Sequence, residues 1–328
     1  MDHWLAKIFV DLTTPFDRGT IDAAGLASLL RWQAGRGIRG FVIAGAIGEC
    51  ATLSADERLA IAAIVRANAG RYAHLIMSAG SNDTAATLLD VDLACRSGAD
   101  AILLRTPFYS RPTQAGIIAH ITAASARSTL PIILDDDPDR CGVAISAATL
   151  GELVALPNIV GLLDRRGDIG RCERVSRALP GRYALLGGQI GTFTCFRLAG
   201  GCGAVSAEAA LFPSLCSWLI ASLRQDDYPT AQMLQRRAYQ VLELLGPQPS
   251  AARMKAALAL LRPGSIALER RVDPDPIDAR WSDEMKQALA GLPRDGATIR
   301  QNTPCPTFGL DHPLGQLAAR VAAKQAQI

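Results

Sequence analysis

The chain has 328 residues, of which 49% are hydrophobic, 20% are charged and 5% are aromatic, and its formal net charge is +3. This composition is typical of a soluble globular protein with an aliphatic core and excludes a largely disordered chain. No run of basic residues is typical of a nucleic-acid-binding surface, so we expect no nucleic-acid partner.

Short aliphatic runs alternate with longer helical patterns along the first 208 residues. The apolar runs are continuous rather than alternating, which is typical of parallel strands buried on both faces. Helices are expected between them, including 23–34 and one that begins at a capping box of Ser54 and Glu57. Eight strand and helix units predict a (β/α)8 TIM barrel, of the α/β class, over 1–208. The expected strands are 8–12, 41–45, 74–80, 101–104, 131–134, 159–163, 183–188 and 203–206.

The chain beyond the eighth strand has a different character. Residues 209–292 read as a C-terminal helical extension, with helices expected at 209–224, 228–245, 249–261 and 282–290. Residues 293–328 begin with a segment rich in Pro, Gly and polar residues, which is typical of an irregular tail. A short final helix is expected at 314–326.

The cysteines and the apolar runs indicate the cellular compartment in which the protein is expected. The eight cysteines include no CxxC pair and no histidines at metal-binding spacing, which is typical of reduced thiols. The N-terminal residues show no cationic segment followed by a long apolar run, and no apolar stretch reaches the ~18 residues of a membrane span. We therefore expect a cytoplasmic protein with no membrane partner.

Four segments near the expected strand ends carry a resemblance to a known family. In chain order they are GAIGECATLSADER, TPFYSRPTQAGIIAHI, ILDDDPDRCG and NIVGLLDRRGDI. Together they resemble the dihydrodipicolinate synthase and N-acetylneuraminate lyase family over residues 8 to 290. The resemblance implies a TIM barrel and a class I aldolase, which joins or cleaves pyruvate through a Schiff base on a lysine. No cofactor is implied.

The position of that lysine, at the end of the sixth strand, is Leu163 in this chain. Leucine has no amine, and the guanidinium of Arg165 stays protonated and does not form imines. Lys7 precedes the first strand and is expected at the opposite mouth of the barrel. Schiff-base aldolase activity is therefore predicted to be absent.

The resemblance also places the other site residues. Asp135 matches the family's proton-relay tyrosine, and Ala46 and Ile47 match two threonines. Arg140 matches an arginine that binds the substrate carboxylate, and Tyr109 matches a tyrosine that reaches into a neighbouring subunit's site, which implies a homodimer or homotetramer. We expect Asp135 and Tyr109 to be catalytic, and the substrate-binding residues to be Arg140, Gly188, Ala46, Ile47 and Val205.

The acidic run at the end of the fifth strand allows more than one interpretation. Its carboxylates, from Asp135, Asp136, Asp137 and Asp139, offer oxygen ligands to a cation such as Mg²⁺. Beside several arginines, they are more often members of a charge network, and we predict no metal. Asp135 is a candidate general base with a pKa raised by burial, and its neutral form could donate a proton. If Arg140 or Arg165 lies close enough to hold it ionised, the pair would mostly fix the loop.

The sequence is compatible with two functional hypotheses. The first is an enzyme that binds a small oxo or sugar acid and catalyses a lyase-type or proton-transfer reaction without a Schiff base. The second is a non-catalytic relative that acts as a binding or assembly partner. Retention of Arg140 and Tyr109 beside new carboxylates favours the enzyme.

Overall fold

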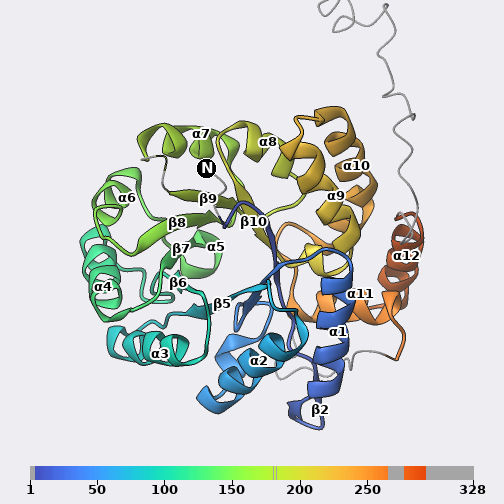
Figure 1. Cartoon of the computed structure of the whole chain (residues 1–328), viewed down its shortest axis with the longest axis horizontal. Coiled ribbons are helices and arrows are strands. Elements are labelled where there is room, and N and C mark those ends of the chain that lie inside the picture. The colour runs from blue at the N-terminus through green and yellow to red at the C-terminus, as the bar shows by residue number, and fades with distance from the viewer. Residues whose placement is uncertain (1–3, 180, 182, 265–276, 293–328) are drawn as a thin grey trace, which may run out of the picture. The chain divides into compact units, whose positions relative to one another are not determined.

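The computed structural model describes residues 4–179, 181, 183–264 and 277–292. Eight parallel strands form a closed barrel in the order β1, β10, β9, β8, β7, β6, β5, β4, and β1 pairs with β4 to close it (Figure 1). The predicted TIM barrel is therefore confirmed. The strands are β1 (Ile8–Asp11), β4 (Gly40–Ile43), β5 (His74–Ala79), β6 (Ala101–Arg105), β7 (Ile132–Asp136), β8 (Ile159–Asp164), β9 (Ala184–Gly187) and β10 (Gly203–Ser206).

The helices between the strands surround the barrel (Figure 1). The capping box predicted at the start of α2 is present, because Ser54 accepts from the amide of Glu57 and Glu57 accepts from the amide of Ser54. A two-stranded hairpin of β2 (Phe16–Asp17) and β3 (Thr20–Ile21) follows β1. The helices are α1 (Ala23–Gly35), α2 (Ala55–Asn68), α3 (Thr84–Arg96), α4 (Gln114–Arg127), α5 (Pro138–Cys141), α6 (Ala147–Leu153), α7 (Ile169–Ala178) and α8 (Phe193–Leu198).

Four further helices follow the eighth strand within the described residues, namely α9 (Pro213–Arg224), α10 (Tyr228–Leu245), α11 (Ala251–Leu261) and α12 (Ala279–Ala290). The first predicted helix, 209–224, begins too early, because a 3-10 turn at Glu208–Ala210 comes first and Pro213 disfavours helix at the preceding residue. The predicted tail, 293–328, and its helix at 314–326 lie outside the described residues. No helix in the described part of the chain is long and apolar enough to cross a membrane.

The centre of the barrel is filled by inward side chains of all eight strands. Leu163 is fully buried there, and so is Val205, which we expected to touch substrate. Both lie among aliphatic and aromatic neighbours, so they belong to the packed core beneath the mouth. The cluster consists of Leu5, Phe9, Val42, Ile76, Ala101, Leu103, Ile133, Leu163, Ala184, Leu186 and Val205.

This packing gives a prediction about the free energy of unfolding. Leu163→Ala should lower it by about 2–5 kcal/mol, because the substitution leaves a cavity in a close-packed core. Leu163→Met conserves the volume and should lower it by less than about 1.5 kcal/mol. Denaturant titration followed by circular dichroism measures both. Equal stability of the two variants would contradict a packed barrel centre at this position.

Candidate active site

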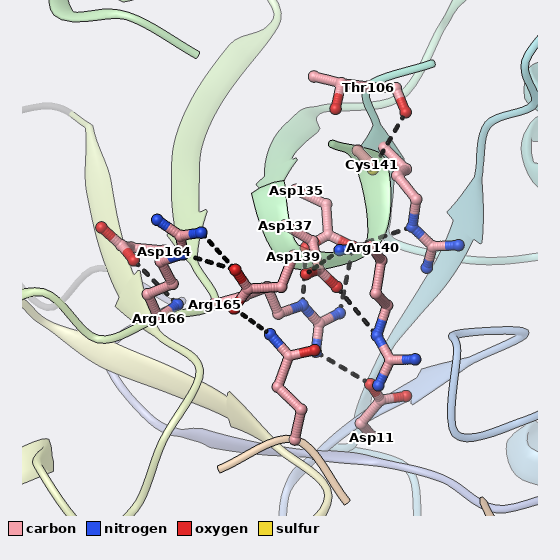
Figure 2. Close-up of polar contacts among 12 residues, drawn as sticks. Asp11, Thr106, Asp135, Asp137, Asp139, Arg140, Cys141, Asp164, Arg165 and Arg166 are labelled. Carbon is pink, nitrogen blue, oxygen red and sulfur yellow. Dashed lines mark hydrogen bonds and ion pairs between the residues drawn. The ribbon is translucent and has the colours of Figure 1, made fainter. Parts of the chain in front are cut away.

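A layer of buried charges closes the barrel immediately above the apolar core. Arg165, in the loop after β8, makes two hydrogen bonds to Asp135 at the end of β7, from Nε to Oδ1 at 2.7 Å and from Nη2 to Oδ2 at 3.1 Å. Its Nη1 donates to Oδ2 of Asp11, at the end of β1, at 3.1 Å. Neither carboxylate is exposed to solvent. Figure 2 shows these contacts with the surrounding acidic run.

The local sequence explains why these side chains meet. Successive residues of a strand point to opposite faces, so Asp135 shares the barrel interior with Ile133 and lies opposite Leu163 in the register. Gly188, which follows β9, permits the close approach of the loop after β8, since a Cβ there would lie 2.7 Å from the Cα of Arg165. The amide of Gly188 donates to the carbonyl of Asp164 at 2.8 Å and is thus already occupied.

The ion pairs decide the charge of the central carboxylates. Burial acts to raise the pKa of Asp135, but the charge and hydrogen bonds of Arg165, with the charges of Arg105 and Arg140, outweigh it and lower the pKa. Burial raises the pKa of Asp11, where the single contact with Arg165 does not compensate for the lost solvent. Of the two states that we considered for Asp135, the structure supports the ionised, arginine-paired one.

The other acidic residues point in different directions and take separate partners. Asp136 and Asp164 lie 2.5 Å and 2.8 Å from the guanidinium of Arg171. Asp137 pairs with Arg140, Nε to Oδ2, at 3.1 Å, and Asp139 pairs with Arg166. Within the described ranges, no group of three or more His, Cys, Asp or Glu side chains is arranged to hold a metal ion. The arrangement is that of a charge network.

Two cavities open near this layer. The smaller, at the mouth itself, has a volume of about 30 Å³, which is room for one or two water molecules, and its walls include Asp11, Ile47, Arg165, Gly188 and Glu208. The larger has a volume of about 770 Å³ and lies beside the ends of β4, β5 and β6. This second volume is within the range of small-molecule sites. Ala46 and Arg140 line both cavities.

Two residues of this region, Arg105 and Glu208, were not predicted from the sequence as site residues. Arg105 ends the apolar strand β6 and is buried, with Nη1 3.8 Å from Sγ of Cys50 and Nε 3.7 Å from Oδ2 of Asp135. Glu208 lines the mouth and accepts a hydrogen bond from Ser206, and burial raises its pKa. The signal for Arg105 was present, since it is spaced by two from the inward-facing Leu103.

The structure brings together most, but not all, of the residues predicted for the site. Arg140, Ala46, Ile47 and Gly188 line the two cavities, and Asp135 lies directly behind the mouth. Val205 lines neither cavity, because the strand directs its side chain into the core. Tyr109 also lines neither; it has a positive φ of 68° and is 89% exposed.

Comparisons with family models, related sequences and solved structures all indicate the same family. The model of the dihydrodipicolinate synthetase family matches residues 4–271. The 4-hydroxy-tetrahydrodipicolinate synthase of Ruegeria pomeroyi is 38% identical over 251 residues, which are 76% of this chain and 86% of the relative. The solved structure of the 4-hydroxy-tetrahydrodipicolinate synthase from Methylacidiphilum fumariolicum SolV has a TM-score of 0.82 at 30% identity, covering 87% of this chain and 95% of that one. The dihydrodipicolinate synthase of Acinetobacter baumannii, solved with pyruvate, has a TM-score of 0.81 at 29% identity, with coverages of 87% and 97%.

The buried pair gives a second prediction about stability. Asp135→Asn should lower the free energy of unfolding by about 3–5 kcal/mol, because it leaves the buried guanidinium of Arg165 without its main counter-charge. Asp139→Asn is the matched control, since its side chain and that of Arg166 are 44% and 55% exposed and such pairs contribute less than about 1 kcal/mol. Denaturant titration measures both variants. A similar small loss in both would show that the central pair is not a structural requirement.

The neighbours Asp135 and Asp136 should titrate on opposite sides of the ordinary value of 3.8. Burial raises the pKa of Asp136 to about 6, whereas Arg165 lowers that of Asp135. The folded protein therefore binds a proton at Asp136 more tightly than the unfolded chain, so this group's contribution to stability falls as pH rises from 3.8 to about 6. The contribution of Asp135 is present at neutral pH and is lost at acid pH, as the pH falls through its lowered pKa. Carbon-13 NMR titration of the carboxyl groups, assigned with Asp136→Asn, measures both midpoints; coincident midpoints would contradict the assignment.

Proposed function

We propose, from the premise that the chain belongs to the dihydrodipicolinate synthetase family, that it is a divergent member without Schiff-base chemistry. It binds a small oxo or sugar acid and catalyses a lyase-type or proton-transfer reaction. The observation that carries this proposal is Leu163, which is fully buried beneath the pair of Asp135 and Arg165. No amine can form an imine at that position.

The lysines of the described ranges lie elsewhere, which supports the loss of imine chemistry. Lys7 precedes β1, at the opposite end of the barrel, and its Nζ is 3.1 Å from Nδ1 of His74. Lys255 on α11 is completely buried and pairs with Glu49 at 2.5 Å. Lys286 lies on α12 and pairs with Asp283.

Acid binding rests on Arg140. Its guanidinium contacts Asp137 through Nε, and the side chain is 38% exposed. Because it lines the larger cavity, a carboxylate entering there can accept a bidentate pair of hydrogen bonds. This geometry supports a ligand with at least one carboxylate.

Asp135 is proposed to position Arg165 and the loop after β8 rather than to transfer a proton, because its carboxylate is fully buried and lines neither cavity. Arg165 keeps its carboxylate ionised, so a role as a proton donor is disfavoured. Tyr109 is proposed to act from a neighbouring subunit of a homodimer or homotetramer. Its exposed side chain, held on a backbone of positive φ, supports a contact outside its own chain.

A non-catalytic binding or assembly partner is the second candidate. The observation that favours it is the mouth above Leu163, where the ion pair of Arg165 and Asp135 leaves only about 30 Å³. A barrel closed at its axis resembles a structural scaffold more than an open aldolase.

The test combines ligand binding with chemical trapping. In a thermal-shift screen, 2-oxo acids or sugar acids should raise the melting temperature by mass action. Borohydride added with pyruvate should leave the intact mass unchanged, whereas a family member that has the lysine should gain the reduced adduct. An adduct on this chain would refute the loss of imine chemistry. A screen without any acid ligand would favour the second candidate.

A further inference from the structure

We propose that the larger cavity binds a dicarboxylic acid, with Arg140 binding one carboxylate and Arg105 the other. This inference rests on the proposed acid-binding function and names the substrate class of the same site. It makes Arg105 a residue that determines specificity, a role that the resemblance does not assign.

Arg105 is a buried cation that lacks good acceptors. It is 7% exposed, and its Nε and Nη2 have no hydrogen-bond partner. The carboxylate of Asp135, 3.7 Å away, already accepts two hydrogen bonds from Arg165. A buried guanidinium that forms so few hydrogen bonds costs free energy, which an added carboxylate would offset.

The contact between Arg105 and Cys50 shows where a ligand would enter. Nη1 is directed at Sγ of Cys50 at 3.8 Å, and both residues line the cavity. Sulfur is a weak acceptor. A carboxylate that enters beside Cys50 would replace this contact with a charge-assisted hydrogen bond, which is shorter and stronger.

The charges on the cavity wall favour a dianion. The acidic groups that line it are already committed, Glu49 to Lys255 and Asp90 to Arg58. The carboxylates nearest the two proposed anchors are Asp135 and Asp137. Both are buried and neither lines this cavity, so they do not repel an anionic ligand from its wall. Of the three arginines that line the cavity, Arg58 is paired with Asp90 on the same wall, which leaves Arg105 and Arg140 as the anchors.

The size and polarity of the cavity fit an acid of four or five carbons. Its volume of about 770 Å³ is more than such a molecule needs, and a ligand that displaces Sγ of Cys50 can reach Nη1 of Arg105. Hydroxyl groups of Thr52, Ser78 and Ser81 also line the wall. They provide neutral hydrogen-bonding groups on the same wall as the two cationic anchors.

The test uses Cys50 as a reporter of occupancy. Alkylation by iodoacetamide is followed by peptide mass spectrometry, with the exposed Cys195 as the internal reference. Succinate and butyrate form a matched pair, since both have four carbons and differ by one carboxylate. Succinate should half-protect Cys50 at a concentration about ten- to a hundredfold lower than butyrate, because it forms one more charge-assisted pair.

Variants assign the second carboxylate to Arg105. Arg105→Gln should abolish the advantage of succinate but retain protection by butyrate through Arg140, and Arg105→Lys, which keeps the charge without the planar fork, should retain part of it. Arg166→Gln is the control, because this exposed arginine pairs with Asp139 outside the cavity. Circular dichroism verifies folding, and calorimetric titration measures the same affinities without the thiol.

The outcomes separate this inference from the proposed function. Equal protection by succinate and butyrate, or an undiminished succinate advantage in Arg105→Gln, would overturn the dicarboxylate while leaving acid binding intact. Failure of both acids to protect Cys50 and to bind by calorimetry would overturn this inference together with acid binding at Arg140.

Discussion

The bidentate ion pair between Arg165 and Asp135 is the constraint on which the mouth of the barrel depends. The Asp135 side chain is completely buried and that of Arg165 is 13% exposed, above an apolar core where an unpaired charge would be strongly destabilising. The pair therefore requires a close approach of the loop after β8, and only glycine at position 188 leaves room for it. The same approach fills the barrel axis and leaves the larger cavity beside β4, β5 and β6.

The unusual residues of the site are physically coupled. Leu163 extends the apolar cluster up to the charged layer, which lowers the polarity around Asp135 and increases the need for a counter-charge. Arg165 provides that charge and also contacts Asp11. A lysine at position 163 would instead place another cation beneath Arg165. The leucine, the aspartate and the arginine are thus compatible with one another, and each is less favourable alone.

The sequence predicted the barrel because its strands are buried on both faces and have an unbroken apolar pattern, which few other elements show. The sequence did not show whether Arg140 or Arg165 forms the ion pair with Asp135. That pairing depends on strand register and on the path of the loop rather than on spacing along the chain. Val205 was assigned to the substrate by resemblance, but alternation along β10 directs it into the core. Arg105 was not predicted as a site residue because a single charged residue after an apolar run usually marks the point where a strand ends and a loop begins.

The charged layer is compatible with the acid site that we propose, which does not depend on an imine. Imine chemistry needs an amine at the barrel axis, and that axis is closed by the central pair. Carboxylate recognition needs only guanidinium groups held in place, and Arg105 and Arg140 each have a buried carboxylate behind them. The contact with Asp137 orients the guanidinium of Arg140 before a ligand arrives, which reduces the entropy cost of binding. In the proposed dicarboxylate site, selection among acids would depend on the number of carboxylates, whereas selection in an imine-forming site depends on the reactivity of a carbonyl.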